Sequence, residues 1–143
     1  MVEDMEKSGF AKRDARRALG LGPLGLFWYQ LRRTLRTSFG GGAYLFHAEL
    51  AAKIEFVLYL LVLVLYWFID ARLQAFLITT VLFLLLLAVE ALNTAIEVII
   101  DRISPEYSLT GKHAKDLGAF AVACCLLLNG IFIGTVVYQS LAG

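Results

Sequence analysis

Three long apolar runs limit what this chain can fold into. They extend from about residue 50 to 69, from 73 to 100 and from 117 to 141. A helix that crosses a bilayer needs about 20 mostly apolar residues, which the second and third runs supply. The first run reaches this length if Lys53 and Glu55 lie at the membrane interface, where a lysine side chain can extend toward water. We therefore expect three transmembrane helices.

The overall composition supports this interpretation. Of the 143 residues, 59% are hydrophobic, and the mean hydropathy is +0.73. A soluble domain of this length has too small an interior for so much apolar surface, and a soluble bundle would need a polar face that these runs lack. The length allows one domain, and a net charge of +1 gives no indication of nucleic-acid binding. The expected fold class is therefore all-α integral membrane.

Basic residues are distributed unevenly among the connecting segments. Residues 1–55 hold nine of the 13 lysines and arginines, the 101–116 loop holds three, and the turn between the first two runs holds only Arg72. Cytoplasmic segments carry an excess of Lys and Arg, so we expect the N-terminus and the 101–116 loop to be cytoplasmic. The charged first 20 residues contain no apolar segment typical of a signal peptide.

The region before the first apolar run divides into two parts. Residues 1–22 form a charged extension, closed by the helix-breaking sequence GLGPLG. Residues 24–38 combine large apolar and aromatic side chains with arginines, which is typical of an amphipathic helix lying in the membrane surface. The glycines at 40–42 then allow a bend before the chain enters the bilayer. Residues 23–143 are thus expected to form the membrane domain.

Polar side chains interrupt the second apolar run at its cytoplasmic end. In the segment EALNTAIEVIID four of them recur at helical spacing: Glu90, Asn93, Glu97 and Asp101. On a helix that turns about 100° per residue, they fall within an arc of about 80°. A carboxylate in hydrocarbon costs roughly 3 kcal/mol or more, so this polar stripe must face protein or the interface and have partners. Hydrogen bonding between helices explains one asparagine well but a row of carboxylates poorly.

The polar stripe has the residue types of a metal and phosphate site. Carboxylates in a row can bind a divalent cation, and another can act as a general base. Glu49 at the start of the first run, and Lys115 and Asp116 at the start of the third, are expected at the same depth. A lysine near clustered carboxylates suits a phosphate bridged by Mg²⁺. We therefore expect a metal and nucleotide site at the membrane surface, with a lipid hydroxyl as the second substrate.

The stretch EALNTAIEVIIDRISPEYSLTGKHAKD, residues 90–116, closely resembles the signature of the bacterial integral-membrane diacylglycerol kinases. That pattern is E-x-L-N-[ST]-A-I-E-x-x-x-D, a short loop and A-K-D, and the resemblance continues back to about residue 30 through Glu49 and Glu55. It implies three transmembrane helices and an N-terminal amphipathic surface helix, assembled in the bacterial inner membrane as a homotrimer with sites shared between subunits. It also implies transfer of the ATP γ-phosphate to diacylglycerol, giving phosphatidic acid.

The resemblance further implies roles for individual residues. Glu90 is expected to be the catalytic general base with Asn93 beside it, and both, together with Glu55, are expected to approach the lipid substrate. Glu49 and Glu97 are expected to hold Mg²⁺ on the phosphates. The residues expected to contact ATP are Glu49, Glu97, Glu106, Tyr107, Ser108, Lys115 and Asp116.

Two departures from the family pattern lie upstream of this signature. Gln30 stands where relatives can carry a basic residue, and SFGGGAYLFHAE is glycine-rich where relatives have longer polar side chains. Contacts from the surface helix to ATP or lipid therefore stay unassigned. Arg32 and Arg33 are close enough in sequence to substitute for the missing basic residue.

Two alternatives to a diacylglycerol kinase remain open. A related branch of the family phosphorylates undecaprenol, although the loop EYSLTGKHAKD looks more like the diacylglycerol branch. The other alternative is a non-enzymatic transporter or channel subunit lined by the polar stripe. Such a protein is expected to have polar residues through the bilayer centre, whereas here the charges gather at one end, which favours chemistry at the surface.

Overall fold

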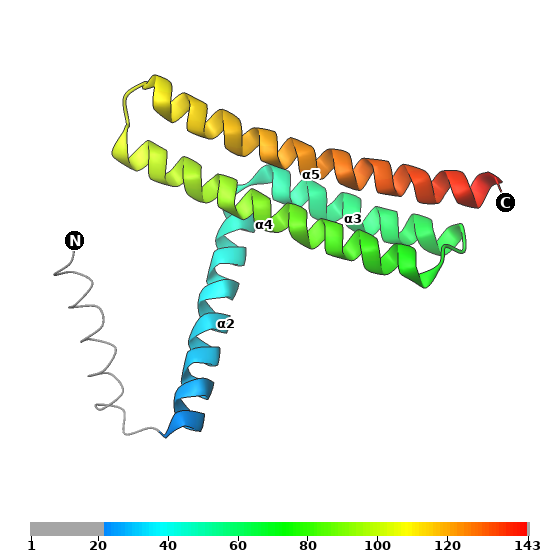
Figure 1. Cartoon of the computed structure of the whole chain (residues 1–143), viewed down its shortest axis with the longest axis horizontal. Helices are drawn as coiled ribbons and strands as arrows, with labels where there is room; N and C mark the ends of the chain where they lie inside the picture. Colours follow the sequence, from blue (N-terminus) through cyan, green and yellow to red (C-terminus); the bar gives the residue numbers. More distant parts are fainter. Residues whose placement is uncertain (1–21, 143) are drawn as a thin grey trace. The chain divides into compact units, whose positions relative to one another are not determined.

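The computed structural model describes residues 22–142, and this part of the chain is helical with short connections (Figure 1). The helices in order are α2 (Pro23–Ala48), α3 (Leu50–Phe68), α4 (Leu73–Ile103) and α5 (Leu109–Ala142). The predicted charged extension, residues 1–22, lies outside the described residues except for Gly22. The described chain falls into two compact units that divide after Gly41, and each is considered by itself below.

Three of the helices can span a membrane. Helices α3, α4 and α5 contain 19, 31 and 34 residues, and each is long and apolar enough to cross a bilayer. Large apolar side chains such as Leu61, Leu84 and Leu127 are exposed on the single chain, which suits contact with lipid rather than water. The prediction of an all-α, multi-pass membrane protein is therefore confirmed.

Helix α5 begins earlier than the sequence predicted. Its expected start was residue 117, but the helix begins at Leu109, because the Ser108 hydroxyl accepts a hydrogen bond from the Gly111 backbone N–H at 3.1 Å and caps the first turn. At a rise of about 1.5 Å per residue, 34 residues extend about 51 Å, well beyond a hydrocarbon core about 30 Å thick. The first turns of α5 therefore carry polar residues outside the hydrocarbon. Helix α4 also extends beyond its predicted range: its expected end was residue 100, but it ends at Ile103.

Helix α2 is longer than the surface helix predicted for residues 24–38. Helix α2 continues without interruption through Gly40, Gly41 and Gly42 and ends at Ala48. A glycine within a helix costs only about 1 kcal/mol relative to alanine, so glycines permit a bend without requiring one. The helical path is broken instead at Glu49, whose backbone is extended with φ −103° and ψ 121°. The location of the α2 residues in the membrane surface stays a prediction.

Hydrogen bonds between side chains join α3 to α4 at the end remote from Glu49. The Thr79 hydroxyl donates to the Tyr66 hydroxyl at 3.1 Å, and both side chains are buried. Tyr59 and Thr80 share a hydrogen bond of 2.9 Å, and the Tyr59 ring stacks on Phe83 with centroids 4.2 Å apart. Such bonds between helices contribute roughly 0.6 kcal/mol each in a membrane and fix the alignment of the two helices.

Helices α4 and α5 lie side by side along most of their length (Figure 1). The Asn129 amide of α5 donates to the Leu82 carbonyl oxygen of α4 at 3.3 Å, and the Ser140 hydroxyl donates to the Ile69 carbonyl oxygen at 2.9 Å. The antiparallel pairing places the beginning of α5 beside the end of α4. The polar stripe of α4 therefore lies next to the residues around Lys115.

Candidate active site

Glu90 is the most deeply buried member of the polar stripe. Only 5% of its surface is exposed, and its Oε2 atom has no hydrogen-bond partner within the described chain. The carboxylates of Glu49 and Glu97 lie close enough for their negative charges to act on it. A buried, unpartnered carboxylate among like charges is costly for a fold. Such a group is therefore expected to have a functional role.

Glu49 reaches the polar stripe from the start of α3. The residue occupies the N-cap position, but its side chain makes no capping hydrogen bond to the first turn of that helix. Its Oε1 atom instead accepts a hydrogen bond of 3.4 Å from the hydroxyl of Thr94, a buried residue of α4. The structure thus brings the predicted metal-binding residue Glu49 to the predicted base, Glu90.

Glu97, the second predicted metal-binding residue, is held by its neighbour one turn earlier. The Asn93 amide nitrogen donates to Glu97 Oε1 at 3.2 Å, while Asn93 Oδ1 is buried without a partner in the described chain. Opposite Asn93, α5 presents Gly118, where an added Cβ atom would overlap Asn93 Oδ1. The glycine therefore allows α5 to approach α4 closely at the polar stripe.

The polar stripe leads from the protein interior to water. Glu90 is buried, Asn93 and Glu97 are half-buried, and Asp101 is exposed. At the outer end, the Lys115 Nζ atom of α5 lies 2.5 Å from Asp101 Oδ1. The exposure of the four side chains in the polar stripe therefore increases toward the α4–α5 loop, and the buried Glu90 carboxylate lies farthest from that loop.

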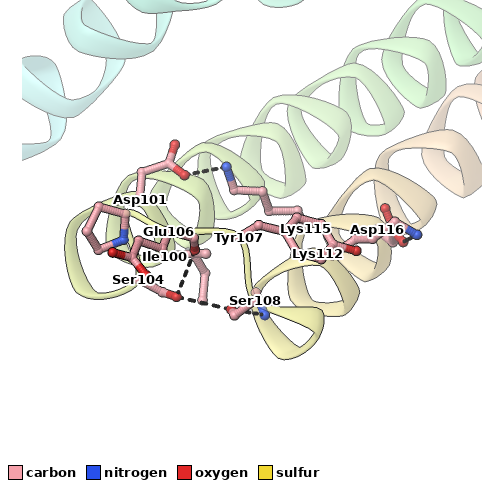
Figure 2. A pocket seen from close by; sticks show the side chains of 11 residues that line it. Ile100, Asp101, Ser104, Glu106, Tyr107, Ser108, Lys112, Lys115 and Asp116 are labelled. Atoms are coloured by element: carbon pink, nitrogen blue, oxygen red, sulfur yellow. Dashed lines mark hydrogen bonds and ion pairs between the residues drawn. The ribbon is translucent and has the colours of Figure 1, made fainter.

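A hollow lies at the α4–α5 loop, and Figure 2 shows its lining. It has a volume of about 310 Å³, and five of the predicted ATP contacts line it: Glu106, Tyr107, Ser108, Lys115 and Asp116. Asp101 also lines it, so the hollow, here called the loop pocket, is continuous with the outer end of the polar stripe. Five of the seven predicted ATP contacts are therefore brought together in space, whereas Glu49 and Glu97 do not line this pocket.

Two residues of the loop pocket were missed by the sequence interpretation. Ser104 donates a hydrogen bond of 3.1 Å to the Ser108 hydroxyl, which ties the end of α4 to the start of α5. Lys112 lines the same pocket, and its Nζ atom lies 3.3 Å from Asp116 Oδ2. The four-residue spacing of Lys112 and Asp116 is a signal of a helical ion pair, but the helix was not expected to include residue 112.

Glu55 lies apart from the loop pocket, in a mostly apolar hollow among α3, α4 and α5. Its side chain is 8% exposed, and its Oε2 atom has no partner within the described residues. Tyr59, Phe83 and Asn129 line the same hollow. Lys53 is exposed, as expected of an interfacial lysine, but Glu55 is buried in protein. The charge of Glu90 acts on Glu55, so the predicted lipid residue lies near the predicted base.

Protein side chains alone do not form a metal cage in the described chain. Between residues 22 and 142 no group of three or more His, Cys, Asp or Glu side chains is arranged to hold a metal ion. Glu49 and Glu97 are two carboxylates that approach Glu90 from α3 and α4. Two carboxylates suffice for Mg²⁺ when phosphate oxygens and water complete its coordination.

Comparison with known proteins identifies the family to which this chain belongs. The family model for prokaryotic diacylglycerol kinase matches residues 36–138, a range that includes the polar stripe and the loop pocket. A diacylglycerol kinase from Sinorhizobium sp is 41% identical over 97 residues, which are 68% of this chain and 71% of the relative. The diacylglycerol kinases of Escherichia coli K12 and Shigella flexneri are each 40% identical over 60 residues, or 42% of this chain and 48% of theirs. The chain therefore belongs to the prokaryotic diacylglycerol kinase family and is a membrane lipid kinase.

Proposed function

We propose that this protein transfers the γ-phosphate of ATP to the free hydroxyl of diacylglycerol, producing phosphatidic acid at the cytoplasmic surface of the bacterial inner membrane. The observation that carries the proposal is the buried Glu90 carboxylate, whose Oε2 atom has no hydrogen-bond partner among residues 22–142. It lies at the inner end of a polar stripe leading to the loop pocket. The names of the relatives favour diacylglycerol as the substrate. The three basic residues of the 101–116 loop favour a cytoplasmic location for this end.

Glu90 acts in this proposal as the general base. The diacylglycerol oxygen forms a bond to the γ-phosphorus, the hydroxyl proton passes to Glu90, and the bond from the γ-phosphorus to the ADP oxygen breaks. An oxygen without a hydrogen-bond partner is free to accept that proton. Phosphoryl transfer requires mainly positioning and charge stabilisation, which a small helical chain can supply. Asn93 orients Glu97 within the same site.

Glu49 and Glu97 would hold Mg²⁺ on the phosphates. In the described chain each uses its Oε1 atom to accept one hydrogen bond, from Thr94 and Asn93 respectively, and the second oxygen of each makes none. Carboxylate oxygens are the ligands that this hard cation prefers. When bound, Mg²⁺ supplies charge neutralisation for the transferred phosphoryl group.

Lys115 and the loop pocket would receive the nucleotide. The Lys115 ammonium group is held near the pocket by Asp101, and the side chains of this pair are 36% and 66% exposed. Exposed ion pairs contribute only about 0–1 kcal/mol, so a nucleotide phosphate can replace Asp101 at little cost. Glu106, Tyr107, Ser108 and Asp116 line the remainder of the pocket. Glu55, buried close to Glu90, would face the lipid.

The proposed assembly is a homotrimer, as the family resemblance implies. Large apolar side chains of all three spanning helices, such as Leu61, Leu84 and Leu127, are exposed on the single chain. Neighbouring copies could cover part of this apolar surface. Cross-linking of the purified protein in detergent tests this assembly directly, with a three-subunit product as the expected result.

A phosphorylation assay tests the proposed function. Purified protein in detergent micelles receives Mg²⁺ and ATP, with diacylglycerol and undecaprenol offered in parallel. We expect phosphatidic acid from the wild type and none above background from Glu90→Gln. Product from undecaprenol alone would keep the chemistry and assign the chain to the other branch of the family. Transfer to neither lipid by a folded protein would contradict the proposal.

A further inference from the structure

We propose that Thr94 is a positioning residue that holds the Glu49 carboxylate at the metal–phosphate site. The inference rests on the function proposed above and extends it to a residue outside the predicted site. Thr94 directly follows Asn93 on α4 and lies one helical turn after Glu90. Only 5% of its surface is exposed, so its hydroxyl is shielded from water.

The first observation concerns the unusual use of the Glu49 side chain. Side-chain oxygens at an N-cap commonly accept hydrogen bonds from the free N–H groups of the first helical turn. Glu49 occupies this position on α3 and makes no such bond. Its carboxylate instead contacts α4 through the Thr94 hydroxyl at 3.4 Å. Within the described residues, Thr94 is therefore the side chain that donates a hydrogen bond to this carboxylate.

The second observation concerns the Thr94 hydroxyl. Thr80 and Thr135 also lie within helices, and their hydroxyls donate to the carbonyl oxygens four residues earlier, at 2.7 and 2.8 Å. The only hydrogen bond of the Thr94 hydroxyl within the described residues goes to another segment, at Glu49. A bond of this length is weak, so its contribution is to direct the carboxylate rather than to stabilise the fold.

The third observation is that α4 orients both predicted metal-binding carboxylates with neighbouring residues. Asn93 donates to Glu97 on its own helix, and Thr94 donates to Glu49 at the start of α3. Adjacent helical residues point about 100° apart, so the two donors reach different segments from one place on α4. Partners that hydrogen-bond to metal ligands typically change metal affinity by about 10–100-fold. Thr94 is expected to act in this way.

The test compares Thr94→Val, which removes the hydroxyl, with Thr94→Ser, which keeps it. Thr79→Val is the matched control. Thr79 lies on α4 15 residues before Thr94, and it is also a buried threonine whose hydroxyl donates a hydrogen bond to α3. Binding of Mn²⁺ in the presence of a non-hydrolysable ATP analogue is measured from the loss of the free-ion electron paramagnetic resonance signal. The same variants are assayed for the Mg²⁺ concentration that gives half-maximal activity and for kcat.

We expect Thr94→Val to weaken Mn²⁺ binding about tenfold and to raise the half-maximal Mg²⁺ concentration by a similar factor. Thr94→Ser should restore both to about the wild-type values, and Thr79→Val should leave both unchanged. If Thr94→Val does not fold, Thr94→Ala provides the same comparison. Glu49→Gln removes one of the proposed ligands, so the decrease in Mn²⁺ binding in this variant shows how much of the bound Mn²⁺ occupies this site.

Two results would overturn the inference while leaving the proposed function intact. One is an active wild type whose Mn²⁺ affinity is unchanged in Thr94→Val. The other is an equal loss of Mn²⁺ affinity in Thr94→Ser and Thr94→Val. The effect would then depend on packing of the methyl group rather than on the hydroxyl. A wild type that phosphorylates no lipid would instead contradict the proposed function itself, and Mn²⁺ binding would still report on the position of Glu49.

Discussion

The two halves of α4 use buried polar side chains in opposite ways. In the first half, Thr79 and Thr80 donate or share hydrogen bonds with Tyr66 and Tyr59 of α3. In the second half, Glu90 has a buried oxygen without a partner in the described chain. Buried polar groups that are fully paired stabilise a fold, whereas an unpaired carboxylate opposes it. The comparison separates the part of α4 that holds the helices together from the part that is available for chemistry.

Replacement of the unpaired base is expected to have the largest effect. Glu90→Gln keeps the size of the side chain but cannot accept the hydroxyl proton, so lipid phosphorylation should fall by roughly 10²–10⁴-fold. Thermal unfolding in detergent should show no loss of stability, because the change removes a buried charge among like charges. A rate comparable to that of the wild type, with the same dependence on pH, would show that Glu90 is not the base.

The close approach of α5 to the polar stripe provides the second prediction. In Gly118→Ala the new methyl group overlaps Asn93 Oδ1, so the Asn93 amide that donates to Glu97 must move. A displacement of about 1 Å in an active site can cost about 10²-fold in rate, and we expect a loss of about this size.

Gly134→Ala on the same helix is the matched control for Gly118→Ala. A Cβ atom at residue 134 meets nothing within 4 Å in this chain, so the activity of Gly134→Ala should equal that of the wild type. Equal activity in Gly118→Ala and the wild type would mean that the contact between α4 and α5 does not position the polar stripe.

Substitutions that break the hydrogen bond between Thr79, in the first half of α4, and Tyr66 should lower the stability of the protein rather than its activity. We expect Thr79→Val and Tyr66→Phe each to lower the free energy of unfolding by about 1 kcal/mol, with a coupling of roughly 0.6–1.7 kcal/mol between them. Unfolding of the two single variants and the double variant in a denaturing detergent measures this coupling. The kcat of all three should stay within about twofold of the wild type, since neither side chain belongs to the polar stripe or the loop pocket. A large loss of kcat would remove the distinction between the two halves.

The smallest effect is expected at the exposed end of the polar stripe. Asp101→Asn breaks the ion pair with Lys115, but the pair is exposed and should contribute no more than about 1 kcal/mol to stability. The same change frees Lys115, so the KM for ATP should fall or remain constant rather than rise. A clear rise in KM would mean that Asp101 itself contacts the nucleotide or its metal.

The sequence predicted the three spanning helices because hydrocarbon thickness sets the length of an apolar helix. It also placed Glu90, Asn93, Glu97 and Asp101 on one face, because that result follows from helical geometry alone. The start of α5 was predicted eight residues too late because an apolar run marks the hydrocarbon, whereas the helix begins where Ser108 caps its first turn. The helix predicted for residues 24–38 extends to Ala48, because glycines at 40–42 weaken a helix but do not by themselves end it.

The membrane-spanning pattern, the polar stripe and the residue types of the site can be predicted from the amino-acid sequence, since each depends on neighbours within a few turns of one helix. The partner that each of these side chains meets depends on the packing of the helices. Glu49 and Thr94 are 45 residues apart, and their contact depends on how α3 is aligned with α4. The contact of Gly118 with Asn93 depends equally on the alignment of α5. Packing between helices sets these alignments, and no local pattern along the chain contains them.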